Sequence, residues 1–104
     1  MKQYRVFIEP PALDDIAGYY GRVVAGAGKT VADGWFKRLS AAICGLKVMP
    51  LRAAVIPEEA EFGLPLRQLV FEGRYRVIFL VEDDRVQVIC VRGYGTPPLG
   101  VTPQ

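Results

Sequence analysis

Runs of apolar residues at two different spacings divide the chain into elements. Residues 4–9 form a short β-rich run that ends at two prolines, and they predict a first strand. Apolar residues then recur every three or four positions along residues 11–25 and again along residues 30–49, which is the spacing of helices that bury one face. The glycine-rich segment 26–28 between them is typical of a helix break. The first half therefore predicts one strand followed by two helices paired in a hairpin.

The start of the second helix has its own sequence signal. Thr30 followed three residues later by Asp33 resembles a capping box, in which the hydroxyl accepts a hydrogen bond from a free backbone N–H. Pro50 interrupts the apolar stripe at the other end. We therefore expect the second helix to begin with Thr30 as its N-cap and to stop before Pro50.

The second half of the chain predicts a loop and then three strands. Residues 51–65 lack periodicity and carry an acidic cluster, Glu58, Glu59 and Glu61, so they predict a loop. Three β-rich runs follow at residues 66–71, 75–82 and 85–92, and they are separated by Glu72-Gly73 and Asp83-Asp84. Turns this short join antiparallel neighbours, so these runs predict a meander of hairpins.

The order of elements, β-α-α-β-β-β, predicts an α+β fold. We expect an antiparallel four-stranded sheet packed against an antiparallel helical hairpin. Residues 1–96 form the predicted domain, and residues 97–104 form an extended proline-rich C-terminal tail. Because the strands are apolar on both faces near their middles, one face takes the hairpin. The other face is either shallowly buried or reserved for a partner.

Composition excludes several kinds of function. The 104 residues include 13 basic and 11 acidic side chains, and a net charge of +2 is too small for nucleic-acid binding through bulk charge. Histidine is absent, which removes the usual acid–base group at neutral pH and the commonest zinc ligand, so we expect no metal site. The two cysteines, Cys44 and Cys90, predict reduced core thiols. Neither a signal peptide nor an apolar run of membrane-spanning length is visible, which predicts a cytoplasmic protein without a membrane partner.

The segment Gly26-Ala27-Gly28-Lys29-Thr30 resembles part of a phosphate-binding loop. The full pattern needs a glycine five positions before Gly28, where Val23 stands, and a strand before the loop, where a helix is predicted. A helix break explains the segment, so we expect no nucleotide cofactor and no other cofactor.

Arginines carry the candidate chemistry. All six positive charges after Lys47 are arginines, and Arg67, Arg76 and Arg92 fall one on each of the last three predicted strands. Side chains at the same level of neighbouring strands, ~5 Å apart, can converge on one phosphate-sized anion. A one-residue change of register would move any of them to the other face, so the sequence leaves their convergence open. Tyr94, just beyond Arg92, can stack on a base, donate a proton or cap the sheet edge.

Ion pairing is the alternative role for these arginines. The carboxylates within reach of such pairs are Glu9, Asp14, Asp15 and Glu72.

Several segments taken together resemble one protein family. The first strand ends in Glu-Pro-Pro and is followed by Ala12-Leu13, Asp15-Ile16 and Tyr20; the second half has Gly63, Leu66-Arg67-Gln68-Leu69, Gly73, Tyr75-Arg76-Val77-Ile78-Phe79 and the strand from Val86 to Arg92. In order and spacing, this succession resembles the RelE/ParE superfamily of bacterial toxins over about residues 3–96. The resemblance makes residues 1–96 a RelE/ParE-like toxin domain.

The resemblance implies a partner and two mechanisms. The partner is a cognate antitoxin whose C-terminal segment wraps the toxin in a hetero-oligomer. One branch of the family cleaves mRNA on the ribosome without a metal, by attack of a ribose 2′-hydroxyl on the adjacent phosphate. The other branch resembles it in shape and blocks DNA gyrase without cutting RNA.

Departures from the RNA-cleaving pattern favour the ParE-like branch. Cleavage needs a base, a proton donor and positive charge at the phosphate. The candidates are Arg67, Arg76 and Arg92 for charge and Tyr94 for the proton, but no residue is a convincing base. We therefore expect the toxin of a type II toxin–antitoxin (plasmid stabilisation) module that inhibits growth by binding a target such as gyrase. The alternatives are a ribosome-dependent endoribonuclease and an inactive toxin-like interaction module.

Overall fold

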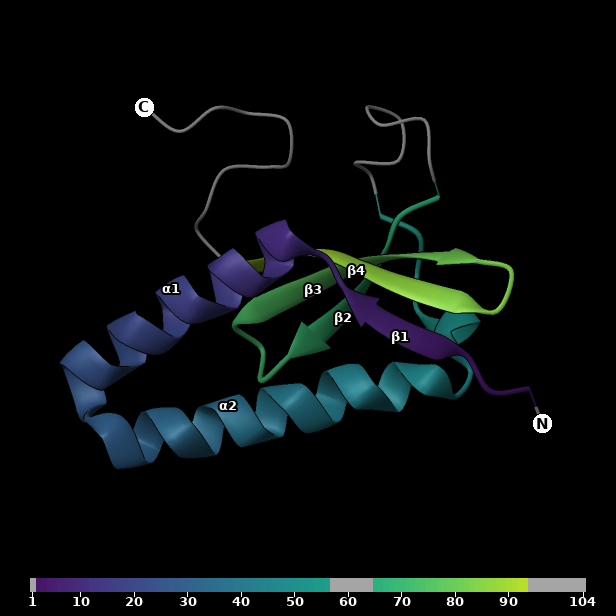
Figure 1. Ribbon diagram of the computed structural model, residues 1–104. Coiled ribbons are helices and arrows are strands. Elements are labelled where there is room, and N and C mark those ends of the chain that lie inside the picture. Colours follow the sequence, from purple (N-terminus) through teal and green to yellow (C-terminus); the bar gives the residue numbers. More distant parts are fainter. Residues whose placement is uncertain (1, 57–64, 94–104) are drawn as a thin grey trace, which may run out of the picture.

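The computed structural model describes residues 2–56 and 65–93, and its elements follow the predicted order. In the described residues, two helices come after the first strand, and three strands follow them (Figure 1). The elements are β1 (Arg5–Ile8), α1 (Pro10–Ala27), α2 (Lys29–Cys44), β2 (Arg67–Phe71), β3 (Tyr75–Glu82) and β4 (Arg85–Gly93), with short 3₁₀ turns at Gly45–Lys47 and Pro50–Arg52. The predicted α+β class is confirmed.

The sheet is mixed, so the prediction of a fully antiparallel sheet was wrong in one pairing. The strand order is β1-β4-β3-β2, in which β2, β3 and β4 are antiparallel neighbours and β1 lies parallel to β4. Short turns fix the directions of β2, β3 and β4. No turn connects β1 to β4, because both helices and two strands intervene, so turn signals could not fix its direction.

The hairpin turns use backbone conformations that their sequences tolerate. Glu72 and Gly73 both have positive φ, 51° and 65°, and the N–H of Arg74 closes the turn on the carbonyl of Phe71 at 3.1 Å. Positive φ at two successive turn residues matches the right-handed twist of the flanking strands. Asp83 has φ 55° in the second turn, a conformation that aspartate adopts more readily than most residues.

The helices meet at Gly28, as the glycine-rich break predicts. Gly28 has φ 94°, and its N–H bonds the carbonyl of Val24 at 2.9 Å, which ends α1. The predicted capping box is wrong: α2 begins at Lys29, and no side chain caps it. Its last α-helical residue is Cys44, and a 3₁₀ turn rather than Pro50 ends it. No helix in the described residues has the length and apolar character needed to span a membrane.

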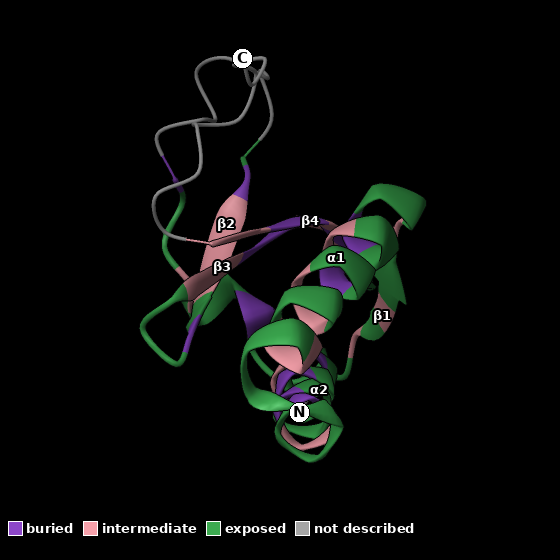
Figure 2. Ribbon diagram, turned by 90° about the vertical axis from the view of Figure 1, so that its left-hand side faces the viewer, coloured by how far each residue is buried: buried purple, intermediate pink, exposed green. Residues whose placement is uncertain are grey.

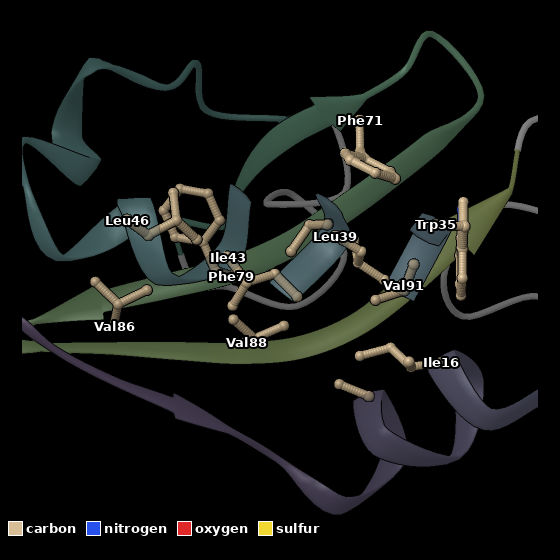
Figure 3. Packing of buried hydrophobic residues seen from close by; sticks show 12 residues of the cluster. Ile16, Trp35, Leu39, Ile43, Leu46, Phe71, Phe79, Val86, Val88 and Val91 are labelled. Atoms are coloured by element: carbon tan, nitrogen blue, oxygen red, sulfur yellow. The ribbon is translucent and has the colours of Figure 1, made fainter. Parts of the chain in front are cut away.

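The main core lies between the helical hairpin and one face of the sheet (Figure 3). Because Trp35, Leu39 and Ile43 recur at helical spacing, they turn one stripe of α2 toward the strands. The strands contribute the buried side chains Phe71, Val77, Phe79, Val86, Val88 and Val91. Phe79, fully buried on β3, is the largest of the side chains that are completely enclosed.

Within residues 2–56 and 65–93, the opposite face of the sheet is covered only in part. A second, smaller cluster consists of Ile56, Leu66, Ile78 and Cys90. Ile56 comes from the segment before β2, and its N–H bonds the carbonyl of Leu66 at 2.9 Å. This coverage fits a shallowly buried second face, and a partner on this face stays a prediction. Figure 2 shows buried, half-buried and exposed residues along these strands. Of the two cysteines, Cys90 is buried as predicted, whereas Cys44 is exposed.

Helix α1 takes the place of β1 beside the last part of β4. The register between β1 and β4 ends at the pair Ile8 and Val88. Beyond it, the carboxylate of Asp15 accepts a hydrogen bond from the N–H of Val91 at 3.0 Å, and the hydroxyl of Tyr19 accepts one from the N–H of Gly93 at 2.7 Å. Asp15 and Tyr19 are four residues apart, so they lie on one side of the helix. Their side chains satisfy strand N–H groups that β1 does not reach.

Candidate functional site

Arg76 and Arg92 lie side by side on the sheet. They are direct cross-strand partners between β3 and β4, and they project on the face that carries Ile78 and Cys90. The Nε of Arg76 donates a hydrogen bond to Oε1 of Gln68 on β2 at 2.7 Å. Arg92 is half-buried, and its buried Nε has no hydrogen-bond partner among the residues that the structure describes. Within the described residues, Arg92 forms no ion pair.

Arg67 lies on the other face of the sheet. Its neighbours at alternate positions, Leu69 and Phe71, pack into the main core, so Arg67 points toward the helical side. Its Nη1 donates to the carbonyl of Ala53 at 2.6 Å and, at 3.4 Å, to the carbonyl of Leu51. Arg67 therefore secures the segment before β2. The structure brings together two of the three candidate arginines.

Cys90 is affected both by burial and by the positive charge of Arg92. Burial raises the pKa of the Cys90 thiol to about 11, although Arg92 next to it favours the thiolate. The thiol therefore stays protonated near neutral pH, and burial outweighs the nearby positive charge. Cys90 is therefore a core side chain beside the arginine pair.

Two groups of predicted residues lie outside the described residues. Tyr94, the proposed proton donor, follows the last described residue. The acidic cluster Glu58, Glu59 and Glu61 belongs to the undescribed segment before β2, and so does Gly63. Their contributions to the site stay as predictions.

A second candidate site is a groove along the helical hairpin. It has a volume of about 470 Å³ and is lined by Leu13, Ile16, Ala17, Tyr20, Asp33 and Phe36. Leu13 is 52% exposed and Phe36 46% exposed, although both are large and apolar. The rings of Tyr20 and Phe36 meet edge to face at 6.3 Å across the two helices. This groove is the kind of apolar surface that a partner helix or strand can cover.

Asp33 joins the two helices at one side of this groove. Its carboxylate accepts a hydrogen bond from the Tyr20 hydroxyl at 2.5 Å and one from Lys29 Nζ at 2.7 Å. Hydrogen bonds from Lys29 and then Tyr20 lower the pKa of Asp33, and the same carboxylate raises the pKa values of Lys29 and Tyr20. The capping-box pattern predicted a role for Asp33 at the helix start, whereas its carboxylate connects α2 to α1 through Tyr20.

We predict that Asp33→Asn makes stability less sensitive to acid. Because the pKa of Asp33 is lowered in the folded state, its contribution is complete above the unfolded value of about 4 and is lost as pH falls through the lower folded value. Urea unfolding at a series of pH values measures this effect. Below about pH 4, wild type should lose more stability than Asp33→Asn. Ser40→Asn, an exposed change on the same helix, should behave as wild type, and equal acid sensitivity of all three proteins would contradict the prediction.

Sequence reasoning missed three side chains that shape these sites. Gln68 holds Arg76, while Asp15 and Tyr19 hold the end of β4. Helical spacing places Asp15 and Tyr19 on one side of α1, and that signal was available. Their strand partners depend on where β1 ends, which the sequence does not indicate.

Comparisons with known proteins find a likeness in fold. No family model and no curated protein matches the sequence. Among solved structures, the chain is similar to a chain of the "Chromosomal ParDE TA system from P. aeruginosa", with a TM-score of 0.74 and 18% sequence identity. The similarity covers 89% of this chain and 98% of that chain. This protein therefore has the same fold as a chain of a ParDE toxin–antitoxin system.

Proposed function

We propose that the protein is the toxin of a type II toxin–antitoxin module for plasmid stabilisation, active in the cytoplasm and neutralised by a cognate antitoxin. The observation that carries the proposal is the likeness in fold to a chain of the ParDE system, which extends over 98% of that chain. The strand segments around Arg67, Tyr75 and Val86, on which the resemblance to the RelE/ParE superfamily rests, form β2, β3 and β4. Sequence resemblance and fold thus support the same family by separate routes.

The proposed mode of action is binding to a macromolecular target such as DNA gyrase. The chain has no histidine, and Arg67 is turned away from the arginine pair. Among the described residues, Asp15 is the carboxylate that bonds β4 near this pair, and it accepts a hydrogen bond from a backbone N–H. None of the described residues near the arginine pair is suited to act as a general base, which favours inhibition by binding over RNA cleavage.

A supercoiling assay tests this proposal. We expect the purified protein to inhibit gyrase at micromolar concentration, and the co-purified antitoxin to restore supercoiling. Induction in a host that lacks the antitoxin should stop growth. Unchanged supercoiling together with arrested growth would overturn the gyrase target, and unaffected growth would favour the inactive interaction module.

We further propose that the antitoxin covers the hairpin groove. The second sheet face already has Ile56 packed over it, whereas Leu13 and Phe36 of the groove are about half exposed. Apolar side chains in such grooves contribute much of the affinity of a complex.

We predict that Leu13→Asp weakens antitoxin binding about tenfold or more, because a carboxylate would be buried in an apolar contact. Isothermal titration measures the change, and Leu51→Asp is the control, since Leu51 is 55% exposed outside the groove. Hydrogen exchange should slow along α1 and α2 when the antitoxin binds. Unchanged exchange on both helices would contradict this docking surface.

The second candidate function is a ribosome-dependent mRNA endoribonuclease. The pairing of Arg76 with Arg92 favours it, because two adjacent guanidinium groups suit a phosphate, and the Arg92 Nε has no partner among the described residues. Primer extension on translated transcripts should then show discrete cuts. Arg76→Ala should suppress them, whereas Arg85→Ala, at an exposed position in the second hairpin, should not.

A further inference from the structure

A separate groove lies between the tip of the helical hairpin and the turn that joins β2 to β3. It has a volume of about 390 Å³. Val23, Ala27 and Val31 line it from the helices, and the rings of Trp35 and Tyr75 line it from the core side. The two ring centroids are 5.4 Å apart. The walls are thus apolar and aromatic, as in many ligand sites.

Guanidinium groups stand at one side of this groove. Arg38 and Arg74 both line it, together with Glu72. The Nε of Arg38 bonds Glu72 at 2.6 Å, so one positive charge is already matched. Arg74 is exposed and forms no ion pair with any described residue. The lining therefore keeps one unmatched positive charge beside an apolar wall.

Trp35, which lines this groove, also carries a buried donor that no described residue satisfies. Its side chain is 4% exposed, and its buried Nε1 has no hydrogen-bond partner among the described residues. Buried N–H groups without an acceptor are uncommon in folded proteins. Figure 3 shows Trp35 at the end of the main core, beyond Val91 and Leu39.

We propose that this groove binds a protein segment that presents an apolar side chain next to a carboxylate. The apolar side chain would lie against Val31, Trp35 and Tyr75, and the carboxylate would accept hydrogen bonds from Arg74. A peptide is favoured over a small molecule because Val31 is 51% exposed, so the apolar wall continues onto the open surface. The inference does not depend on the proposed toxin function.

Two blocked tetrapeptides test the proposal: acetyl-Ser-Leu-Glu-Ser-amide and the same peptide with Gln in place of Glu. The chain has one tryptophan, so a single indole N–H resonance reports on Trp35 in NMR titrations. We expect the Glu peptide to shift this resonance and to bind about tenfold more tightly than the Gln peptide, because only the carboxylate adds an ion pair with Arg74 to the hydrogen bond. Equal binding of the two peptides, or no shift of the indole resonance, would overturn the proposal.

Variants test whether the Glu peptide binds in this groove and whether a change in the net charge of the protein alone weakens it. Arg74→Gln and Val31→Asp should each weaken the Glu peptide about tenfold. Their controls are Arg85→Gln, at an exposed position in the other hairpin, and Thr30→Asp, which adds the same charge next to Val31 but outside the lining. Both controls should bind as wild type, and losses as large as those of the groove variants would refute the site. If 4-methylpentanoate, a free apolar acid, binds as tightly as the Glu peptide, the site takes small acids and the peptide proposal fails.

Discussion

Replacing Phe79 with alanine is expected to lower the free energy of unfolding by about 3–5 kcal/mol. Phe79 is fully buried on β3, one of the two central strands, and packs in the core shared with α2. Removing its ring would leave a cavity bounded by both layers, and these can close it only in part. A domain of 104 residues has a total stability of about 5–15 kcal/mol, so this one change removes a large share of it.

Denaturant unfolding followed by circular dichroism measures this loss. Phe36→Ala is the matched control, because it removes the same ring from a position that is 46% exposed on α2. We expect the control to cost less than about 1 kcal/mol. Similar costs for the two variants would contradict the packing of the core described above.

Asp15→Ala is expected to destabilise the protein by about 1–3 kcal/mol. The Asp15 carboxylate accepts the hydrogen bond of the Val91 N–H, and Val91 is fully buried. Without it, a strand N–H at the junction of α1 and β4 would lose its acceptor. Leaving a buried N–H without an acceptor costs more free energy than a formed hydrogen bond contributes. The loss of stability is therefore expected to be larger than for removal of a surface carboxylate.

Asp14→Ala is the control for this prediction. Asp14 is the exposed neighbour of Asp15 on the same turn of α1, and its removal should change stability by less than about 0.5 kcal/mol. Amide hydrogen exchange adds a local measurement, since the Val91 N–H should exchange faster in Asp15→Ala. Unaltered exchange at Val91 would show that this contact is dispensable.

The sequence predicted those parts of the fold that local signals determine. The hydrophobic spacing of α2, the glycine at the helix break and the turns at Glu72-Gly73 and Asp83-Asp84 all appear where expected. The parallel alignment of β1 with β4 did not follow, because it depends on contacts between segments more than 70 residues apart. The capping box failed because the Asp33 carboxylate bonds Lys29 on its own helix and Tyr20 on the neighbouring helix, and sequence spacing cannot show the contact with Tyr20.

The sequence predicted which arginines could form the candidate site, but it did not predict on which face of the sheet each of them lies. Arginines on consecutive strands were visible from the sequence, and Arg76 with Arg92 fulfils the expectation that such residues can meet. Arg67 stands one residue out of phase with them, so strand alternation turns it toward the helices. The hairpin groove lies between two consecutive helices, whereas the groove at Arg74 also needs the turn between β2 and β3, and residue patterns along the chain could not place that turn beside the helices.

The pairing of β1 with β4 has a consequence for how the protein is made. During synthesis Arg5–Ile8 leaves the ribosome well before its neighbour Arg85–Val88 is translated. Until then β1 has no strand beside it, and the helical hairpin has no complete sheet to cover. The nascent protein is therefore expected to acquire its native shape, and any activity that needs that shape, only after β4 has been translated.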